Sequence, residues 1–195
     1  MTAAGARFAR RALVTALLGL PLAGSVRAQA AADIWAALRG GGHFALIRHA
    51  LAPGNNDPPG FRLDDCSTQR NLSAEGRAQA ARIGELFRAN GIVQARVLSS
   101  QWCRCTETAT LLGLGAVTPQ PLLNSFVRDR ERGLRQTQAL RSWLGQQDLA
   151  QPMVLVTHQV VITALSEVFP GSGEIVVMRR LPDGGLSVAG RLATA

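Results

Sequence analysis

Two short apolar runs in this chain each end in a histidine, and this pattern strongly limits the folds open to it. Phe44 to Ile47 leads to Arg48 and His49. The run from Val154 to Val156 leads, through one threonine, to His158. Four apolar residues between a triple glycine and a loop rich in Pro, Gly and Asn indicate a buried strand. Because open α/β sheets bind ligands at the carboxyl ends of their strands, the pattern predicts an α/β protein with a site at that edge.

The rest of the chain alternates strand and helix patterns. Ser73 is a favoured N-cap for a helix that runs to Asn90, and Gly91 is its predicted stop. Further strands are expected at 97–99, 153–157, 174–179 and 186–191, and further helices at 101–112, 130–147 and 160–168. The last two strands should form a hairpin. This alternation predicts a single-domain, three-layer α/β/α sandwich with a mostly parallel sheet.

The residues at the strand ends are chemically suited to phosphate. Histidine is a nucleophile that can be phosphorylated, and arginine binds phosphate through two parallel hydrogen bonds. Arg104 follows the strand predicted at 97–99 and adds a second arginine at the same edge. Taken singly, each residue also has a structural explanation, as a surface arginine or a core histidine. The combination of these histidines and arginines at one edge of the sheet favours a phosphate site.

Four motifs, in order, resemble those of the histidine phosphatase superfamily, which has the phosphoglycerate-mutase-like fold. They are Arg48-His49-Ala50, Leu72-Ser73-x-x-Gly76-x-x-Gln79-Ala80, Ser99-x-x-x-x-Arg104-x-x-x-Thr108-Ala109, and the apolar strand that ends in Thr157-His158. The resemblance runs from about residue 43 to about residue 180. It implies that His49 is the phosphorylated nucleophile, that Arg48 and Arg104 clamp the phosphoryl oxygens and lower the pKa of His49, and that His158, if protonated beside the phosphate, adds a further donor. It implies no metal and no cofactor.

The chain departs from the superfamily pattern in two small residues and in the general acid. Ala50 and Thr157 stand where glycine is usual, and we expect Ala50 to be tolerated because it is still small. The glutamate that many members carry after the next strand is absent from 122–126. Asp129 is the candidate acid, and a surface charge paired with a neighbouring arginine is the alternative. Without an acid, the enzyme would be restricted to good leaving groups.

The loop from 51 to 65 is expected to rim the pocket. Asn55 in this loop is a candidate substrate-binding residue, although Asn-rich loops are often only turns. Arg70 and Arg128 are further possible substrate contacts.

The first thirty residues have the features of a secretory signal peptide. A basic start precedes an apolar stretch at 12–22 that is too short to span a bilayer, and Ala28-Gln29-Ala30 is a small-x-small cleavage site. We expect cleavage after Ala30, a mature domain at 31–195, and a periplasmic or secreted protein without a stable membrane span. Sec and twin-arginine export stay open, and a retained membrane anchor is the alternative.

Charge limits the partners of the mature chain. The full chain carries +8, and all 21 of its basic residues are arginine. Four of them precede residue 31, which leaves 17 basic against 13 acidic residues and a net charge of +4. No basic run with interleaved aromatic residues indicates nucleic-acid binding, whereas a positive cleft attracts a phosphorylated small molecule or sugar phosphate. No Cys-x-x-Cys or His-x-x-x-His spacing indicates a metal site.

The three cysteines fit an exported protein, in which disulfides persist. Cys103 and Cys105 lie two apart on a predicted helix and are unlikely to bond to each other. We favour a bond between Cys66 and Cys103, and three unpaired thiols are the alternative.

These features predict a phosphatase that hydrolyses a phosphate monoester or phosphoramidate through a phosphohistidine on His49. One alternative is a non-catalytic protein that binds a phosphorylated ligand in the same pocket. A role as a lipopolysaccharide core sugar phosphatase is a more specific possibility within the first function.

Overall fold

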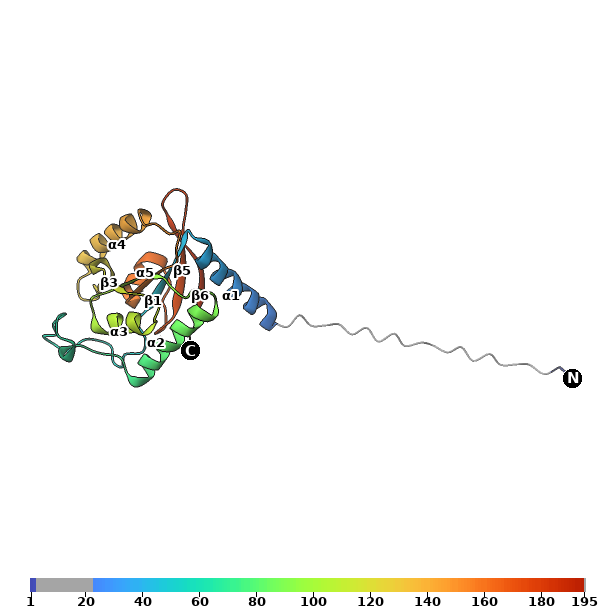
Figure 1. Ribbon diagram of the computed structural model, residues 1–195, viewed down its shortest axis with the longest axis horizontal. Coiled ribbons are helices and arrows are strands. Elements are labelled where there is room, and N and C mark those ends of the chain that lie inside the picture. Colours follow the sequence, from blue (N-terminus) through green and yellow to red (C-terminus); the bar gives the residue numbers. More distant parts are fainter. Residues whose placement is uncertain (3–22, 195) are drawn as a thin grey trace.

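A six-stranded sheet forms the centre of the computed structural model, which describes residues 1–2 and 23–194 (Figure 1). The helices of this part of the chain are α1 Ala23–Gly40, α2 Ala74–Ala89, α3 Cys103–Leu111, α4 Arg130–Gly145 and α5 Gln159–Ser166. The strands are β1 His43–Arg48, β2 Arg96–Ser99, β3 Val117–Pro119, β4 Met153–Thr157, β5 Ile175–Arg180 and β6 Leu186–Leu192. Two single 3-10 turns lie at Cys66–Thr68 and Pro121–Leu123.

The strand order is β3-β2-β4-β1-β5-β6. The first four strands of this order pair in parallel, whereas β5 is antiparallel to both β1 and β6. The predicted mostly parallel sheet and the predicted hairpin are therefore confirmed. The centre of the sheet is the pair β4 and β1, the two strands that His158 and His49 directly follow.

Alternating side chains of the strands build two cores, one on each face of the sheet. Ala45 and Ile47 of β1 face the core formed with α1, α2 and α3, whereas Phe44 and Leu46 face the core formed with α4 and α5. Strands buried on both faces need continuous apolar sequence, and this is why β1 and β4 appear as unbroken apolar runs. The arrangement is the expected three-layer α/β/α sandwich.

Helix α2 begins and ends as its sequence predicts. The Ser73 hydroxyl accepts a hydrogen bond from the Gly76 N–H at the N-cap, and Gly91 follows the helix with a φ of +79°. In the middle of α2, Gly84 faces the end of α3. A Cβ atom at Gly84 would lie 2.0 Å from the Leu112 carbonyl oxygen. Glycine thus allows the close approach of α2 to the helix that carries Arg104.

Helix α1 runs through the expected cleavage site. Ala28 to Ala30 are exposed, whereas Trp35 and Leu38, further along α1, are buried in the core. The apolar stretch at 12–22 lies outside the described residues. Among the described residues, no helix is both long enough and apolar enough to cross a membrane.

Candidate active site

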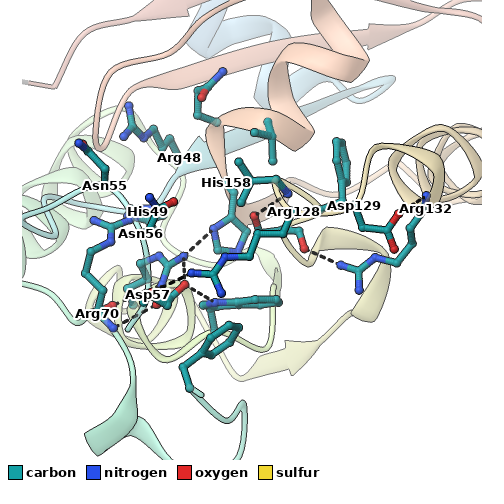
Figure 2. Close-up of a pocket in the computed structure, with 18 residues that line it drawn as sticks. Arg48, His49, Asn55, Asn56, Asp57, Arg70, Arg128, Asp129, Arg132 and His158 are labelled. Carbon is teal, nitrogen blue, oxygen red and sulfur yellow. Dashed lines mark hydrogen bonds and ion pairs between the residues drawn. The ribbon is translucent and has the colours of Figure 1, made fainter. Parts of the chain in front are cut away.

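Parallel pairing of β1 with β4 brings the two histidines together. Arg48 pairs with Thr157 in the register of these strands, and the His49 N–H donates to the Thr157 carbonyl over 2.9 Å. The rings of His49 and His158 consequently lie with their centroids 5.5 Å apart. Figure 2 shows both residues in one pocket, together with the arginines that line it.

His49 is held as a neutral imidazole with a defined tautomer. Its Nδ1 lies 2.8 Å from the carbonyl oxygen of Ala50, so Nδ1 carries the proton and Nε2 keeps its lone pair. Burial lowers the pKa of His49 to about 3, and the positive charge of Arg104 adds to the effect. At neutral pH, Nε2 is therefore a free nucleophile.

Ala50 occupies the position of the usual glycine without strain. In the described part of the chain, Glu167 is the one non-glycine residue with positive φ, so Ala50 has an ordinary backbone conformation. Its side chain is buried, and its N–H donates to the Thr108 hydroxyl over 3.1 Å. The backbone conformation therefore does not require glycine at this position.

Hydrogen bonds define the tautomer of His158. Arg104 Nη2 lies 3.4 Å from Nδ1 of His158, and the Ser100 hydroxyl lies 2.8 Å from Nε2. Because arginine can only donate, Nδ1 is the acceptor and Nε2–H donates to Ser100. Burial lowers the pKa of His158 well below its ordinary value, and the neighbouring His49 and arginines add to the effect. His158 is therefore neutral in the ligand-free site, and its protonation beside a bound phosphate stays a prediction.

Three arginines offer hydrogen-bond donors to an anion. Among the described residues, the Nε atoms of Arg48, Arg70 and Arg104 are buried and have no hydrogen-bond partner. In two of these arginines another donor is occupied. Arg48 Nη1 donates to the Pro170 carbonyl over 3.0 Å, and Arg70 Nη1 donates to the carbonyl of Ala52. All three arginines line the pocket, where guanidinium groups can bind an oxyanion through charge-assisted hydrogen bonds.

Electrostatics favour the same conclusion. Burial lowers the pKa of both Arg48 and Arg70, and the charge of Arg104 lowers each further. Clustered like charges repel one another, so a bound anion would relieve the repulsion. The site is arranged to bind a compact, multiply charged oxyanion.

Asp57 is a residue of this site that the sequence did not reveal. Its carboxylate accepts hydrogen bonds from Arg104 Nη1 at 2.7 Å, from the Trp102 indole at 3.0 Å and from the Arg70 backbone N–H at 3.0 Å. Burial alone raises the pKa of Asp57, but the hydrogen bonds from Arg104, Arg70 and Trp102 outweigh burial and hold the pKa below its ordinary value. In the sequence, Asp57 is one acidic residue in a turn-rich loop, with no motif to separate it from Asp64 or Asp65.

The remaining predicted residues lie at the pocket rim. Asn55, Arg128 and Asp129 all line the pocket, which has a volume of about 220 Å³ (Figure 2). The Asp129 carboxylate accepts a hydrogen bond from the Arg132 N–H over 2.9 Å and caps α4. One carboxylate oxygen of Asp129 thus has a helix-capping role, and the structure places the side chain at the mouth of the site.

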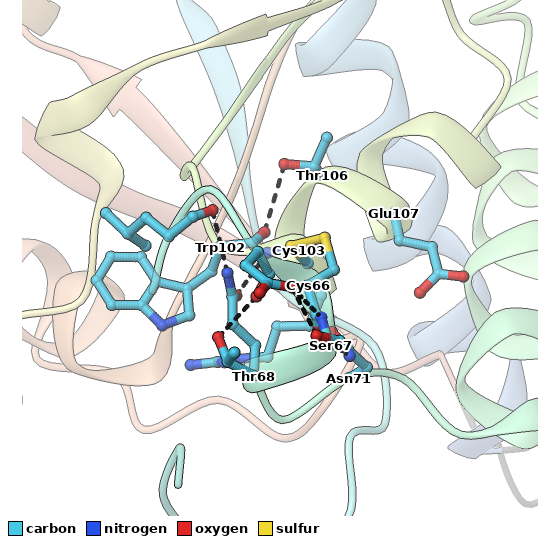
Figure 3. Close-up of a disulfide and its surroundings, with 12 residues drawn as sticks. Cys66, Ser67, Thr68, Asn71, Trp102, Cys103, Thr106 and Glu107 are labelled. Atoms are coloured by element: carbon cyan, nitrogen blue, oxygen red, sulfur yellow. Dashed lines mark hydrogen bonds between the residues drawn. A yellow bond between two sulfur atoms is a disulfide. The ribbon is translucent and has the colours of Figure 1, made fainter. Parts of the chain in front are cut away.

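A disulfide joins the rim loop to the helix that carries Arg104. Cys66 and Cys103 are bonded, with their Cα atoms 5.7 Å apart, as Figure 3 shows. This pairing confirms the one that we favoured. Cys105 is the free cysteine of the described chain and is buried against His158, and burial raises the pKa of its thiol to about 12. A thiol with this pKa is protonated at neutral pH and is not a nucleophile.

Residues 44–126 match the Histidine phosphatase superfamily (branch 1). This range contains Arg48, His49 and Arg104, whereas His158 lies beyond it. No curated protein gives a significant match to the sequence.

Several solved structures share the fold. The protein histidine phosphatase SixA complexed with tungstate is 14% identical, with a TM-score of 0.57 over 78% of this chain and 97% of its own. A putative phosphohistidine phosphatase SixA from Agrobacterium tumefaciens is 20% identical, with a TM-score of 0.53 over 77% of this chain and 97% of its own. A phosphoserine phosphatase mutant from Entamoeba histolytica, in complex with phosphoserine, is 16% identical, with a TM-score of 0.55 over 78% of this chain and 97% of its own.

These similarities are to phosphoglycerate-mutase-like α/β folds, and the fold of this chain is of that type. The family match over residues 44–126 shows a similarity to the histidine phosphatase superfamily in that part of the chain, and the solved structures show a shared fold.

Proposed function

We propose that this chain is an exported phosphatase that hydrolyses phosphate monoesters through a phosphohistidine on His49. The observation that carries the proposal is the cluster of Arg48, Arg70 and Arg104 that lines one pocket with a neutral His49 of defined tautomer. A phosphoryl group presents three non-bridging oxygens and a phosphorus atom that is open to in-line attack. The donor set and the nucleophile match these two requirements.

In the first half-reaction, the Nε2 lone pair of His49 forms a bond to phosphorus while the bond from phosphorus to the leaving oxygen breaks. Arg48, Arg70 and Arg104 stabilise the charge that spreads over the non-bridging oxygens. The leaving oxygen takes a proton from Asp129, the carboxylate at the mouth of the pocket. In the second half-reaction, water attacks phosphorus, gives its proton back to Asp129 and releases His49 and inorganic phosphate.

His158 is neutral before substrate arrives, and its role changes once an anion is bound. The negative charge of the phosphoryl group favours the protonated imidazole and raises the pKa of His158. To donate to the phosphoryl group, His158 takes this proton on Nδ1 and gives up the hydrogen bond from Arg104 Nη2, while Nε2–H stays on Ser100. Asp57 acts through Arg104, because it accepts hydrogen bonds from both Nη atoms and so fixes the orientation of the guanidinium group in the pocket.

The substrate class that we propose is a phosphorylated small molecule outside the cytoplasm. The pocket of about 220 Å³ is large enough for a phosphoryl group and the adjoining atoms of its leaving group. Export follows from the proposed signal peptide at 1–30. Phosphoserine bound to one structural neighbour is consistent with such a substrate.

Trapping the covalent intermediate tests the proposal. The mature chain is mixed with radiolabelled p-nitrophenyl phosphate, quenched after milliseconds under alkaline conditions, and the labelled residue is identified by peptide mass spectrometry. We expect acid-labile label on His49, and we expect His49→Ala to remain folded without turnover. Label on another residue would contradict the mechanism, and tight phosphate binding without any turnover would favour the non-catalytic binding protein.

A further inference from the structure

A second hollow opens beside the phosphate pocket, between α4 and α5. Its volume is about 780 Å³, and it shares Phe126, Val127 and Val160 with the pocket. A molecule bound in the pocket can therefore extend into this groove without leaving the surface. The groove is lined by Phe126, Val127, Arg130, Gly133, Leu134, Thr137, Gln138, Arg141, Val160 and Ala164.

The walls of the groove are mainly apolar and are open to solvent. Leu134 is 78% exposed and Val127 is 58% exposed, although large apolar side chains are usually covered. Gly133 permits the Phe126 ring to lie against α4, because a Cβ atom there would come within 2.5 Å of the ring. The ring thus forms a wall that continues from the phosphate pocket into the groove.

The charges around the groove are positive. Arg130 and Arg141 are its charged lining residues, and no carboxylate is present among the described residues that line it. Arg141 is fixed across α5, where its Nη2 donates to the carbonyls of Ala164 and Leu165 at 3.1 and 2.8 Å. A hollow with apolar walls, a cationic rim and an anion site at one end is complementary to an amphiphilic anion.

We propose that the preferred substrate is a phosphate monoester whose leaving group carries an alkyl or acyl chain, and that this chain lies in the groove. This inference rests on the proposed phosphatase function. A sugar is a poorer fit, since its hydroxyl groups need hydrogen-bond partners, and the uncharged polar side chains of the groove are those of Thr137 and Gln138.

The test is a chain-length series measured with the mature enzyme. Ethyl, butyl, hexyl and octyl phosphate are supplied below their micelle concentrations, and inorganic phosphate release gives kcat/KM for each. Burying one methylene group raises binding affinity by about 4-fold. We therefore expect kcat/KM to rise by about 2- to 4-fold for each methylene group that enters the groove. The kcat/KM for octyl phosphate should also exceed that for glucose 6-phosphate. Dihexanoyl phosphatidate is measured in the same way, and this comparison distinguishes a substrate with a single chain from a lipid with two chains.

A matched pair of variants assigns the effect to the groove. Leu134→Gln removes an exposed apolar wall and should flatten the chain-length dependence while ethyl phosphate turnover stays unchanged. Val93→Gln changes another exposed apolar residue, 70% exposed and outside both hollows, and should leave the series unaltered. Binding of octylphosphonate and ethylphosphonate, measured by calorimetry, repeats the comparison without turnover.

The outcomes separate this inference from the proposed function. The inference is overturned if ethyl phosphate is hydrolysed but kcat/KM does not rise with chain length. It is also overturned if glucose 6-phosphate or a phosphoserine peptide is hydrolysed faster than octyl phosphate. In both cases the proposed phosphatase function stands. Failure to hydrolyse any monoester would overturn the proposed function, and tighter binding of octylphosphonate than of ethylphosphonate would then still assign the groove to an alkyl chain.

Discussion

The Asp57 carboxylate lies against the Arg104 guanidinium, with Oδ1 2.7 Å from Nη1 and Oδ2 3.3 Å from Nη2. The two side chains are 10% and 4% exposed. This ion pair joins the rim loop to the first turn of α3 and consumes both terminal nitrogens of Arg104. The remaining donor, Nε, is the one without a partner in the described structure. A buried ion pair of this kind is better explained by orientation of the arginine than by stability, because desolvation offsets much of the attraction.

Replacing Asp57 should separate turnover from phosphate binding. In Asp57→Ala, Arg104 loses its anchor, and misplacement of a clamp residue lowers kcat by up to about 100-fold. Affinity for inorganic phosphate should be unchanged or higher, because a negative charge has left the site. Steady-state kinetics and phosphate inhibition measure the two effects. Asp57→Asn, which keeps an acceptor for Arg104, should recover part of kcat, and Asp64→Ala in the same loop is the control. A parallel loss of kcat and phosphate affinity would refute the positioning role.

Replacing Asp129 should distinguish substrates by their leaving group. Asp129→Asn removes the proton but keeps a good N-cap for α4, so the fold should be unaffected. Help from a general acid is worth about 10²- to 10⁴-fold, and we expect that loss with alkyl phosphates. p-Nitrophenyl phosphate should be hardly affected, because its phenolate leaves without protonation. Asp148→Asn, outside the pocket, is the control; a small and equal effect on both substrates would mean that Asp129 is only a helix cap.

The buried His49 should make the protein less stable in acid. Its pKa is lowered from 6.5 to about 3, so the unfolded chain binds the proton more tightly than the folded chain. The stabilisation is fully present above pH 6.5 and is lost as the pH falls towards 3, at about 1.4 kcal/mol per pH unit. Urea unfolding between pH 7 and pH 4 should show a shallower decline in His49→Gln than in the wild type. Equal slopes would mean that His49 titrates normally.

Reduction of the disulfide should destabilise the domain. Cys66 and Cys103 are separated by 37 residues, and closing a loop of this length is worth about 4 kcal/mol through the entropy of the unfolded chain. The double variant Cys66→Ser/Cys103→Ser should lose roughly that amount in chemical denaturation. A reducing agent should lower the stability of the wild type alone. If the reducing agent lowers the stability of the double variant by the same amount, the loss of stability does not come from this disulfide.

Cleavage after Ala30 should release a domain of unchanged stability. Trp35 and Leu38, which anchor α1 in the core, lie beyond the expected cut. Mass spectrometry of the protein from a periplasmic extract should find Ala31 at the N-terminus, and thermal unfolding should match that of the chain with residues 1–30 retained. An intact Met1 chain confined to the cytoplasm would contradict export.

Local sequence predicted most elements of this protein and its candidate site residues, whereas helix α1 and strand β3 were not predicted. Strands β1 and β4 are buried on both faces, so their apolar runs are continuous and their ends are sharply marked by Arg48 and His158. Ser73 and Gly91 delimit α2 through hydrogen bonding and backbone conformation that depend only on neighbouring residues. Information of this kind is local, and it was therefore accessible from the sequence.

Tertiary structure alone decided the contacts between elements and the charge states that follow from them. Asp57 reaches Arg104 across 47 positions of sequence, and no local pattern encodes that approach. The neutral state of His158 depends on how deeply it is buried and on which arginines surround it, and the groove between α4 and α5 depends on how two helices pack. Burial and long-range electrostatics depend on which side chains surround a residue in the folded protein. For this reason the sequence identified the candidate histidines, whereas the fold determined their protonation states.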